Sequence, residues 1–189
     1  PDIVKTDGKY LYILVNSKIY IVKVYPAEGA FVLSNISLDG IEVSNFFINN
    51  DELIIFSKSY RFPTSYTTKD TCYYWNGISA TLIKIYDVSD KENPKVKKVI
   101  KIDGFYFDAR MIDDNIYVIS IQNMYTIYPF LENESHIIPQ IRIDNESCKI
   151  PANDIYYIDA PETIETTTHI AVVDLTDFSV ITGIGVIPT

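Results

Sequence analysis

Short apolar runs rich in Ile, Val, Tyr and Phe recur along the whole chain, and clusters of Gly, Pro, Asn and Asp separate them. β-Branched and aromatic residues suit a pleated, half-buried surface, and the clusters between them are typical of turns. The pattern therefore predicts an all-β protein.

The apolar runs repeat as longer units, which is the signature of a repeat architecture. Val43 to Ser57 aligns with Phe107 to Ser120 at an offset of 63 residues, and Asp2 to Leu14 fits the same template at an offset of 43. In each copy an extended run meets a DG, ND or DD turn and then a second apolar run. This order predicts a β-hairpin.

A second pair of runs completes each unit. Thr81 to Asp90 matches Thr168 to Asp177, Lys18 to Pro26 is a looser copy, and a further apolar run follows each of them. Three units of four antiparallel strands, each about 40 residues long without insertions, match the period of propeller blades. We therefore expect a β-propeller segment of about three four-stranded antiparallel blades.

The expected blades span residues 2–40, 41–104 with an insertion at 58–80, and 105–189 with an insertion at 123–167. Propellers close with about four to eight blades. We therefore expect the remaining blades of a parent propeller, or a second copy, as partners. The start at Pro1 rather than Met indicates a processed product or an excised piece.

One stretch carries a family resemblance. Ile85 to Ser120 resembles the LVIVD-type repeat of archaeal and bacterial surface propellers, and more closely a family of secreted prokaryotic propellers distantly related to WD-type repeats. The DVSDxxNP turn and the DARMIxD strand carry it. The resemblance implies a propeller at the cell surface or outside the cell, and that family has no assigned activity to transfer.

Charge and hydropathy narrow the classes of partner. A net charge of −9 and a pI near 4.6 disfavour nucleic acid, whose binding requires clustered cations. No run approaches the roughly 18 apolar residues that predict a membrane span. A surface protein or a glycan is a more suitable partner.

The two insertions are expected on one face of the propeller, because they occupy equivalent places in two blades. They are rich in aromatic residues, which are frequent anchors for recognition. The alternative is that the rings pack the insertions onto the blades. The residues proposed for this binding face are Tyr73, Tyr74, Trp75, Tyr156 and Tyr157.

A second candidate site lies at the expected mouth of the central channel. Asp2, Asn45 and Asp108 start the first strands at matching positions, and Arg110 follows. Their oxygen atoms could hold a polar ligand or, as a remoter option, a divalent cation. Alternatively, the acidic groups cap turn amides and Arg110 pairs with carboxylates.

The oxygen-rich stretch from Asp87 to Pro94 lacks the glycine of an EF-hand and is interpreted as a turn.

Cysteines and sequons agree with an exported protein. Cys72 and Cys148 lie in the two insertions, so a disulfide could link them, although two free thiols remain the alternative. Asn-X-Ser sequons occur at Asn35, Asn133 and Asn145.

No catalytic motif is present. The two histidines have no partner at zinc-binding spacing, and nucleophile, metalloprotease and nucleotide fingerprints are missing from the sequence, so we predict no catalytic residue, metal or cofactor. The expected function is an extracellular binding or scaffolding module. The alternative is an enzyme, a hydrolase or a cofactor-dependent oxidoreductase, with a channel-mouth site completed by further blades.

Overall fold

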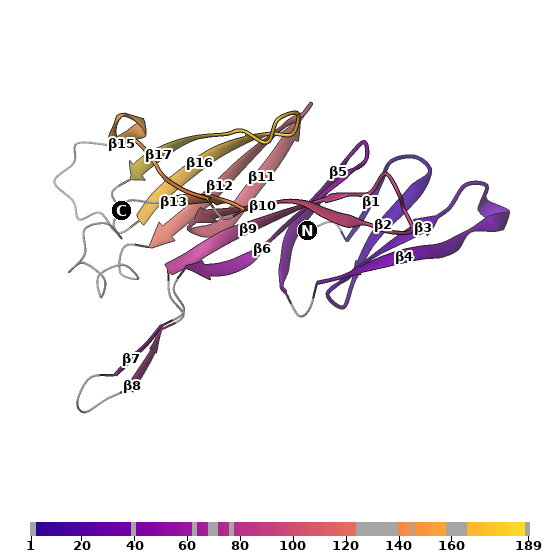
Figure 1. Ribbon diagram of the computed structural model, residues 1–189, viewed down its shortest axis with the longest axis horizontal. Helices are drawn as coiled ribbons and strands as arrows, with labels where there is room; N and C mark the ends of the chain where they lie inside the picture. Colours follow the sequence, from indigo (N-terminus) through magenta and orange to yellow (C-terminus); the bar gives the residue numbers. More distant parts are fainter. Residues whose placement is uncertain are drawn as a thin grey trace. The chain divides into compact units, whose positions relative to one another are not determined.

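A computed structural model describes residues 3–38, 41–61, 64–67, 72–75, 78–123, 140–144, 146–157 and 166–187. It divides into two compact units, Pro1–Ser57 with Ile83–Val99, and Lys58–Leu82 with Ile100–Thr189. The elements in the described part are strands and short 3-10 turns, which confirms the all-β prediction (Figure 1).

The first sheet has four strands in chain order, β1-β2-β3-β4, and neighbouring strands are antiparallel. A 3-10 turn, η1 (Ala27–Gly29), precedes the last of them. The strands are β1 (Val4–Thr6), β2 (Tyr10–Val15), β3 (Lys18–Lys23) and β4 (Phe31–Ser37).

The second sheet has six strands in the order β14-β13-β10-β9-β6-β5, two more than predicted. Its expected strands are β5 (Val43–Asn49), β6 (Glu52–Arg61), β9 (Ile78–Asp87) and β10 (Lys95–Asp103). The second insertion adds β13 (Gln140–Ile143) and β14 (Glu146–Lys149). Ile100 to Ile102 of β10 pair with β13, so this part of β10 is an inner strand of the sheet.

The third sheet has the order β11-β12-β16-β17-β15. Its last strand also comes from the second insertion and runs parallel to β17. One insertion thus covers the outer edges of two sheets, where unpaired N–H and C=O groups would otherwise be exposed. The strands are β11 (Phe105–Ile112), β12 (Asn115–Asn123), β16 (Thr166–Asp174), β17 (Val180–Ile187) and β15 (Ile155–Tyr157), the last preceded by η5 (Ala152–Asp154).

The first insertion folds differently. Its strands β7 (Thr64–Thr67) and β8 (Cys72–Trp75) form a two-stranded sheet of their own.

One hydrogen bond recurs in all three blades. An amide at the end of the third strand donates to a carbonyl in the first turn: Val24 to Lys9 at 3.3 Å, Val88 to Asp51 at 2.8 Å, and Leu175 to Asp114 at 2.8 Å. The first two carbonyls lie 42 residues apart, so the predicted offset of 43 is wrong by one residue. The offset of 63 between the second and third copies holds.

The residue types in the first turn of each blade explain why the predicted offset was one residue too large. Gly8, Asn50 and Asp113 all have positive φ, at 92°, 49° and 51°. Because Gly, Asn and Asp all tolerate the left-handed conformation, the residue types in a turn do not define its alignment. Strand pairing defines the alignment instead. Val4 lies opposite Ile13, and the residues 42 positions further along the chain, Phe46 and Ile55, also lie opposite each other.

The core of the first unit is the contact between two sheets. Tyr12, Ile19 and Ile21 of the first sheet have no exposed surface, and they belong to one cluster with Phe46 and Leu53 of the second. The opposite face of the first sheet stays partly exposed.

A buried polar network surrounds the bend at Gly104, between β10 and β11. The carbonyl of Asp103 accepts hydrogen bonds from the Ser120 hydroxyl at 2.8 Å and from Nδ1 of His169 at 2.7 Å. Because a carbonyl only accepts, Nδ1 of His169 carries the proton, and Nε2 faces the Thr167 hydroxyl at 3.0 Å. At the next residue, Gly104, the amide donates to the carbonyl of Ser79 at 2.8 Å.

Two glycine substitutions test the packing at this bend. Gly104 has a φ of 95°, and an added Cβ would lie 3.0 Å from the Ile121 carbonyl carbon, whereas Gly8 has a φ of 92° with nothing within 4 Å. We expect Gly8→Ala to cost about 1 kcal/mol of unfolding free energy and Gly104→Ala roughly 2–4 kcal/mol, because only the latter adds a clash to the strain. Urea denaturation measures both, and equal losses would contradict the packing at Gly104.

Candidate functional site

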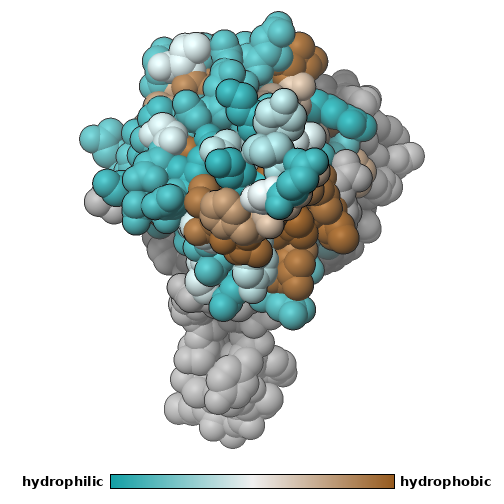
Figure 2. Space-filling view, turned by 90° about the vertical axis from the view of Figure 1, so that its right-hand side faces the viewer, coloured by the Kyte–Doolittle hydropathy of each residue, from teal (hydrophilic) through white to brown (hydrophobic). Residues whose placement is uncertain are grey.

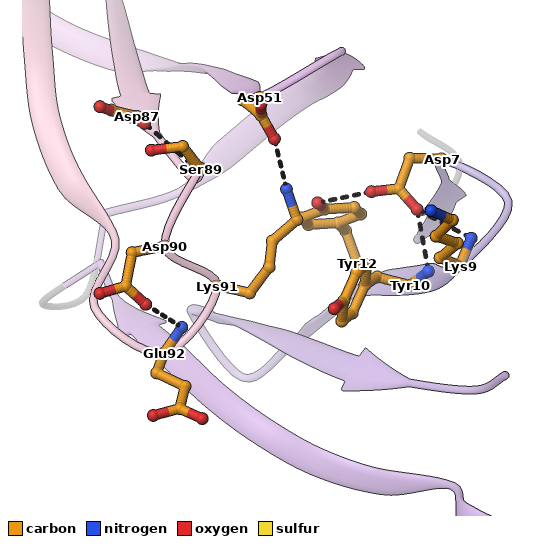
Figure 3. Close-up of polar contacts among 10 residues, drawn as sticks. All are labelled: Asp7, Lys9, Tyr10, Tyr12, Asp51, Asp87, Ser89, Asp90, Lys91 and Glu92. Atoms are coloured by element: carbon orange, nitrogen blue, oxygen red, sulfur yellow. Dashed lines mark hydrogen bonds and ion pairs between the residues drawn. The ribbon is translucent and has the colours of Figure 1, made fainter. Parts of the chain in front are cut away.

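The most elaborate polar site of the first unit lies where the turn after β9 reaches the hairpin of the first sheet (Figure 3). The ammonium of Lys91 lies 2.8 Å from the Asp51 carboxylate and 5.6 Å from the centre of the Tyr10 ring. The Lys91 side chain is only 11% exposed. An ion pair and a cation–π contact thus hold one largely buried cation.

Asp7 organises the hairpin beside this lysine. Its carboxylate accepts hydrogen bonds from the amides of Lys9 at 3.0 Å and Tyr10 at 2.8 Å, and from the Tyr12 hydroxyl at 3.0 Å. Partial burial raises the pKa of Asp7, but these three donors together outweigh it, so the pKa lies below its ordinary value. Burial and the neighbouring Asp7 charge raise the pKa of Tyr12, so its hydroxyl stays a donor.

A cleft of about 300 Å³ opens between this turn and the first sheet. Aromatic rings and charged groups of both signs line it, which gives it features of a polar recognition site. The lining residues are Tyr10, Lys23, Phe31, Leu33 and the turn residues from Ser89 to Glu92. The turn could be predicted from the sequence. Its contact with the first sheet could not, because the contact joins residues that lie far apart in the chain.

The turn interpretation of Asp87 to Pro94 is confirmed. The Asp87 carboxylate accepts from the Ser89 amide at 2.9 Å, and the Asp90 carboxylate from the Glu92 amide at 3.0 Å. Hydrogen bonds from the Ser89 side chain and amide lower the pKa of Asp87. Those from the Asn93 side chain and the Glu92 amide lower the pKa of Asp90. The carboxylate oxygens of Asp87 and Asp90 thus accept hydrogen bonds from backbone amides of the turn itself.

The third blade repeats these caps. Asp174 accepts from the Thr176 amide at 2.7 Å, and Asp177 from the Ser179 amide at 2.8 Å. The hydrogen bond from Ser179 lowers the pKa of Asp177.

The predicted channel-mouth residues Asn45 and Asp108 occupy equivalent irregularities in β5 and β11. At each, the side-chain oxygen accepts from the next amide, that of Phe46 or Ala109, at 2.9 Å. This is the capping role weighed in the sequence analysis. With the corrected offset, Ile3 rather than Asp2 is equivalent to Asn45, and Asp2 lies outside the described residues.

Arg110 lies 3.8 Å from the Asp108 carboxylate, and the two side chains are 81% and 47% exposed. Exposed ion pairs of this length contribute little to stability. In the part of the chain that the structure describes, no group of three or more acidic, His or Cys side chains could hold a metal ion.

The aromatic residues of the insertions lie in two separate elements. In the β7–β8 sheet, Tyr73, Tyr74 and Trp75 pair with Tyr66, Ser65 and Thr64, and their side chains lie outside the described part. Tyr156 on β15 is 67% exposed, and only the backbone of Tyr157 is described.

In the third sheet, β15 is one edge strand and β11, which carries Asp108, is the other. Pairing with β17 satisfies backbone groups of β15 that a free loop would leave exposed.

Cys148 is a free, exposed thiol on β14. The structure therefore does not show the predicted bond, which stays a prediction because the side chain of Cys72 lies outside the described residues. Of the sequons, Asn35 is exposed on β4, and Asn133 and Asn145 lie outside the described part.

No helix in the described ranges is long and apolar enough to span a membrane.

The repeated sheets, turn contacts and caps agree with a comparison of this sequence with models of known protein families. A family model described as "Beta propeller domain" matches residues 1–185. The chain belongs to this β-propeller family. A stretch of 122 residues, 65% of the chain, is 29% identical to the uncharacterized protein MJ1554 of Methanocaldococcus jannaschii and covers 15% of that protein. The chain thus corresponds to a small part of this relative's length, and no solved structure matches it.

Lys91 should stabilise this propeller segment more than an ordinary surface lysine does. We expect Lys91→Ala to lower the free energy of unfolding by about 1–2 kcal/mol, because the ion pair, the ring contact and the packing of its stem are all lost. Lys97→Ala is the matched control, since its side chain is 43% exposed and 2.5 Å from Glu52, and it should cost roughly 0–0.5 kcal/mol. Equal losses in urea titrations would contradict the special role of Lys91.

The lowered pKa of Asp7 makes part of the stability depend on pH. Its folded pKa lies below the unfolded value of about 3.9, so its contribution is complete above that value and is lost as the pH falls through the folded pKa. We expect Asp7→Asn to lose less stability between neutral pH and the acid range than the native chain. Parallel slopes for the two proteins in denaturant titrations across pH would contradict this assignment.

Proposed function

We propose that the chain is a binding module of a cell-surface propeller and that the β7–β8 hairpin is its recognition element. The observation that carries the proposal is the separate sheet of this hairpin, whose strands pair with each other and with none of the blade strands in the described part. Binding loops carried on a rigid scaffold are a common use of repeat folds.

The composition of the hairpin supports recognition. β8 consists of Cys72, Tyr73, Tyr74 and Trp75, so three of its four residues are Tyr or Trp. An isolated two-stranded hairpin is at best marginally stable in water. Large amphipathic rings contribute contact area with a polar tip, and a bound surface would order the hairpin.

The blades form a suitable scaffold. β13 and β15 extend two of the sheets and cover their outer strands, which stiffens the support from which the hairpin emerges. The proposed surface location rests on the resemblance of Ile85 to Ser120 and on the exposed sequon at Asn35. A surface protein or a glycan is the expected ligand class.

The enzyme alternative finds less support in the described residues. His169 is 1% exposed, and both of its ring nitrogens lie within hydrogen-bond distance of internal partners. A general base must reach a substrate proton, so this histidine is structural. The remaining candidates, Asp108 and Arg110, carry no further sign of catalysis.

The test combines binding and stability. We expect the variant with Tyr73, Tyr74 and Trp75 all changed to alanine to lose binding to an array of defined oligosaccharides and surface peptides by about 30-fold, which corresponds to roughly 2 kcal/mol. Its Tm should stay unchanged, because the blade strands do not pair with the hairpin.

Tyr25→Ala is the matched control, since this ring is 72% exposed and lies outside both insertions. It should leave both measurements unchanged. Retained binding with a lowered Tm in the triple variant would show that the rings only pack the insertion, and would overturn the proposal.

A further inference from the structure

We propose that the cleft between the first sheet and the turn after β9 binds a free amino acid with an apolar side chain. The site is independent of the β7–β8 hairpin. Its lining residues all lie within Pro1–Ser57 and Ile83–Val99, which form one compact unit. Strands and a turn of this chain therefore provide both walls of the cleft.

A row of three side chains forms the sheet wall. Tyr10 lies opposite Lys23, and Lys23 lies opposite Phe31, so the lysine stands between two aromatic residues. By the two-residue period of a strand, Tyr10 and Lys23 share a face with Tyr12 and Ile21, which pack on the second sheet. The row thus continues a face that a blade of the same unit covers.

The turn that forms the other wall is fixed to its surroundings without a ligand. The Ser34 hydroxyl on β4 donates to the carbonyl of Lys91 at 2.5 Å. The Lys91 ammonium lies over the Tyr10 ring and pairs with Asp51, and the amide of Val88 donates to the carbonyl of Asp51 at 2.8 Å. Because these contacts hold the walls in place, a ligand loses less free energy to ordering them.

Two departures from the blade repeat meet at this cleft. β3 and β4 shift register between Ile21 and Val22, which leaves Leu33 as the extra residue of a bulge, and Leu33 lines the cleft. The equivalent strands of the third blade, β16 and β17, pair without a shift. The connection after β9, residues 88–94, is also longer than the one after β16, residues 175–179. Bulges and lengthened loops are frequent beside binding sites.

The charges of the turn are a third departure. The capping aspartates repeat in the second and third blades, so they belong to the turn itself. The two residues after the second cap are Lys91 and Glu92 in one blade but Phe178 and Ser179 in the other. The fold of the turn therefore does not require the charges that line the cleft.

Two charged groups of the lining remain available to a ligand. Within the part of the chain that the structure describes, the ammonium of Lys23 and the carboxylate of Glu92 have no hydrogen-bond or ion-pair partner. The Asp90 carboxylate already accepts from backbone amides of the turn, and Lys91 already pairs with Asp51. Figure 3 shows the Glu92 side chain pointing away from that ion pair.

These two groups define the polar part of the ligand. The Lys23 ammonium suits a carboxylate, and the Glu92 carboxylate suits an ammonium, because charge-assisted hydrogen bonds are the stronger ones. A ligand that carries both charges satisfies both residues at once. A free amino acid has this pair of groups on one carbon atom.

Apolar surface accompanies the charges. The Phe31 ring is 51% exposed and lines the same cleft as Leu33. Figure 2 shows hydrophobic and hydrophilic residues next to each other on the side of the molecule that carries the first sheet. The cleft holds about 300 Å³, the small end of the range for ligand pockets. Its size and lining therefore suit a single amino acid with an apolar side chain.

NMR titration of the full chain with L-phenylalanine tests the proposal. We expect saturable binding, and Lys23→Met and Glu92→Gln should each weaken it about tenfold or more, because each removes one charge-assisted hydrogen bond. Lys18→Met and Glu28→Gln are the matched controls, since both residues are exposed outside the cleft, and they should leave the affinity unchanged. An unchanged Tm in every variant shows that the fold is intact.

Two further probes separate the chemistry of the ligand. N-acetyl-L-phenylalaninamide keeps the ring but lacks both charges, so it should bind about tenfold more weakly or worse. Equal binding of this amide, saturable binding of D-glucose in its place, or no saturable binding of L-phenylalanine would each overturn the proposal. The triple alanine variant of the hairpin should bind L-phenylalanine as the native chain does, which keeps this test separate from that of the hairpin.

Discussion

Each blade of this chain is a twisted sheet with apolar residues on both faces, and such a sheet is stable only when another layer covers each face. In the first unit this contact buries Tyr12, Ile19 and Ile21 completely against the second sheet. Full burial of one such aliphatic side chain is worth about 1.5–3 kcal/mol. The Lys91 contact depends on it, because the turn reaches Tyr10 only when the sheets are packed.

The outer edges of the sheets impose a second constraint, because their backbone N–H and C=O groups need partners. The second insertion provides these partners. Its strands β13 and β15 pair with β10 and β17, so one excursion of the chain completes two different sheets. The first insertion forms its own hairpin instead. This difference separates the insertion that extends the blades from the hairpin that we propose as the recognition element.

The sequence allowed the strands and hairpins to be predicted because alternating apolar runs and turn residues are local signals. It misplaced the first repeat by one residue, because Gly8 and Asn50 satisfy the same left-handed turn with different residue types. Short added strands such as β15 have no repeated pattern to reveal them. The roles of Lys91 and Asp108 depend on contacts and on an irregular strand pairing, which periodicity does not encode.

The burial of equivalent residues in the three blades is the central claim, and Tyr12 and Tyr117 test it directly, since one is fully covered and the other is 40% exposed. Hydroxyl-radical footprinting with mass spectrometry measures the reactivity of both rings in one sample. The account predicts that Tyr12 is unreactive, because the second sheet covers its ring, and that Tyr117 is reactive in the same sample. Equal reactivity of the two rings in dilute solution would contradict it.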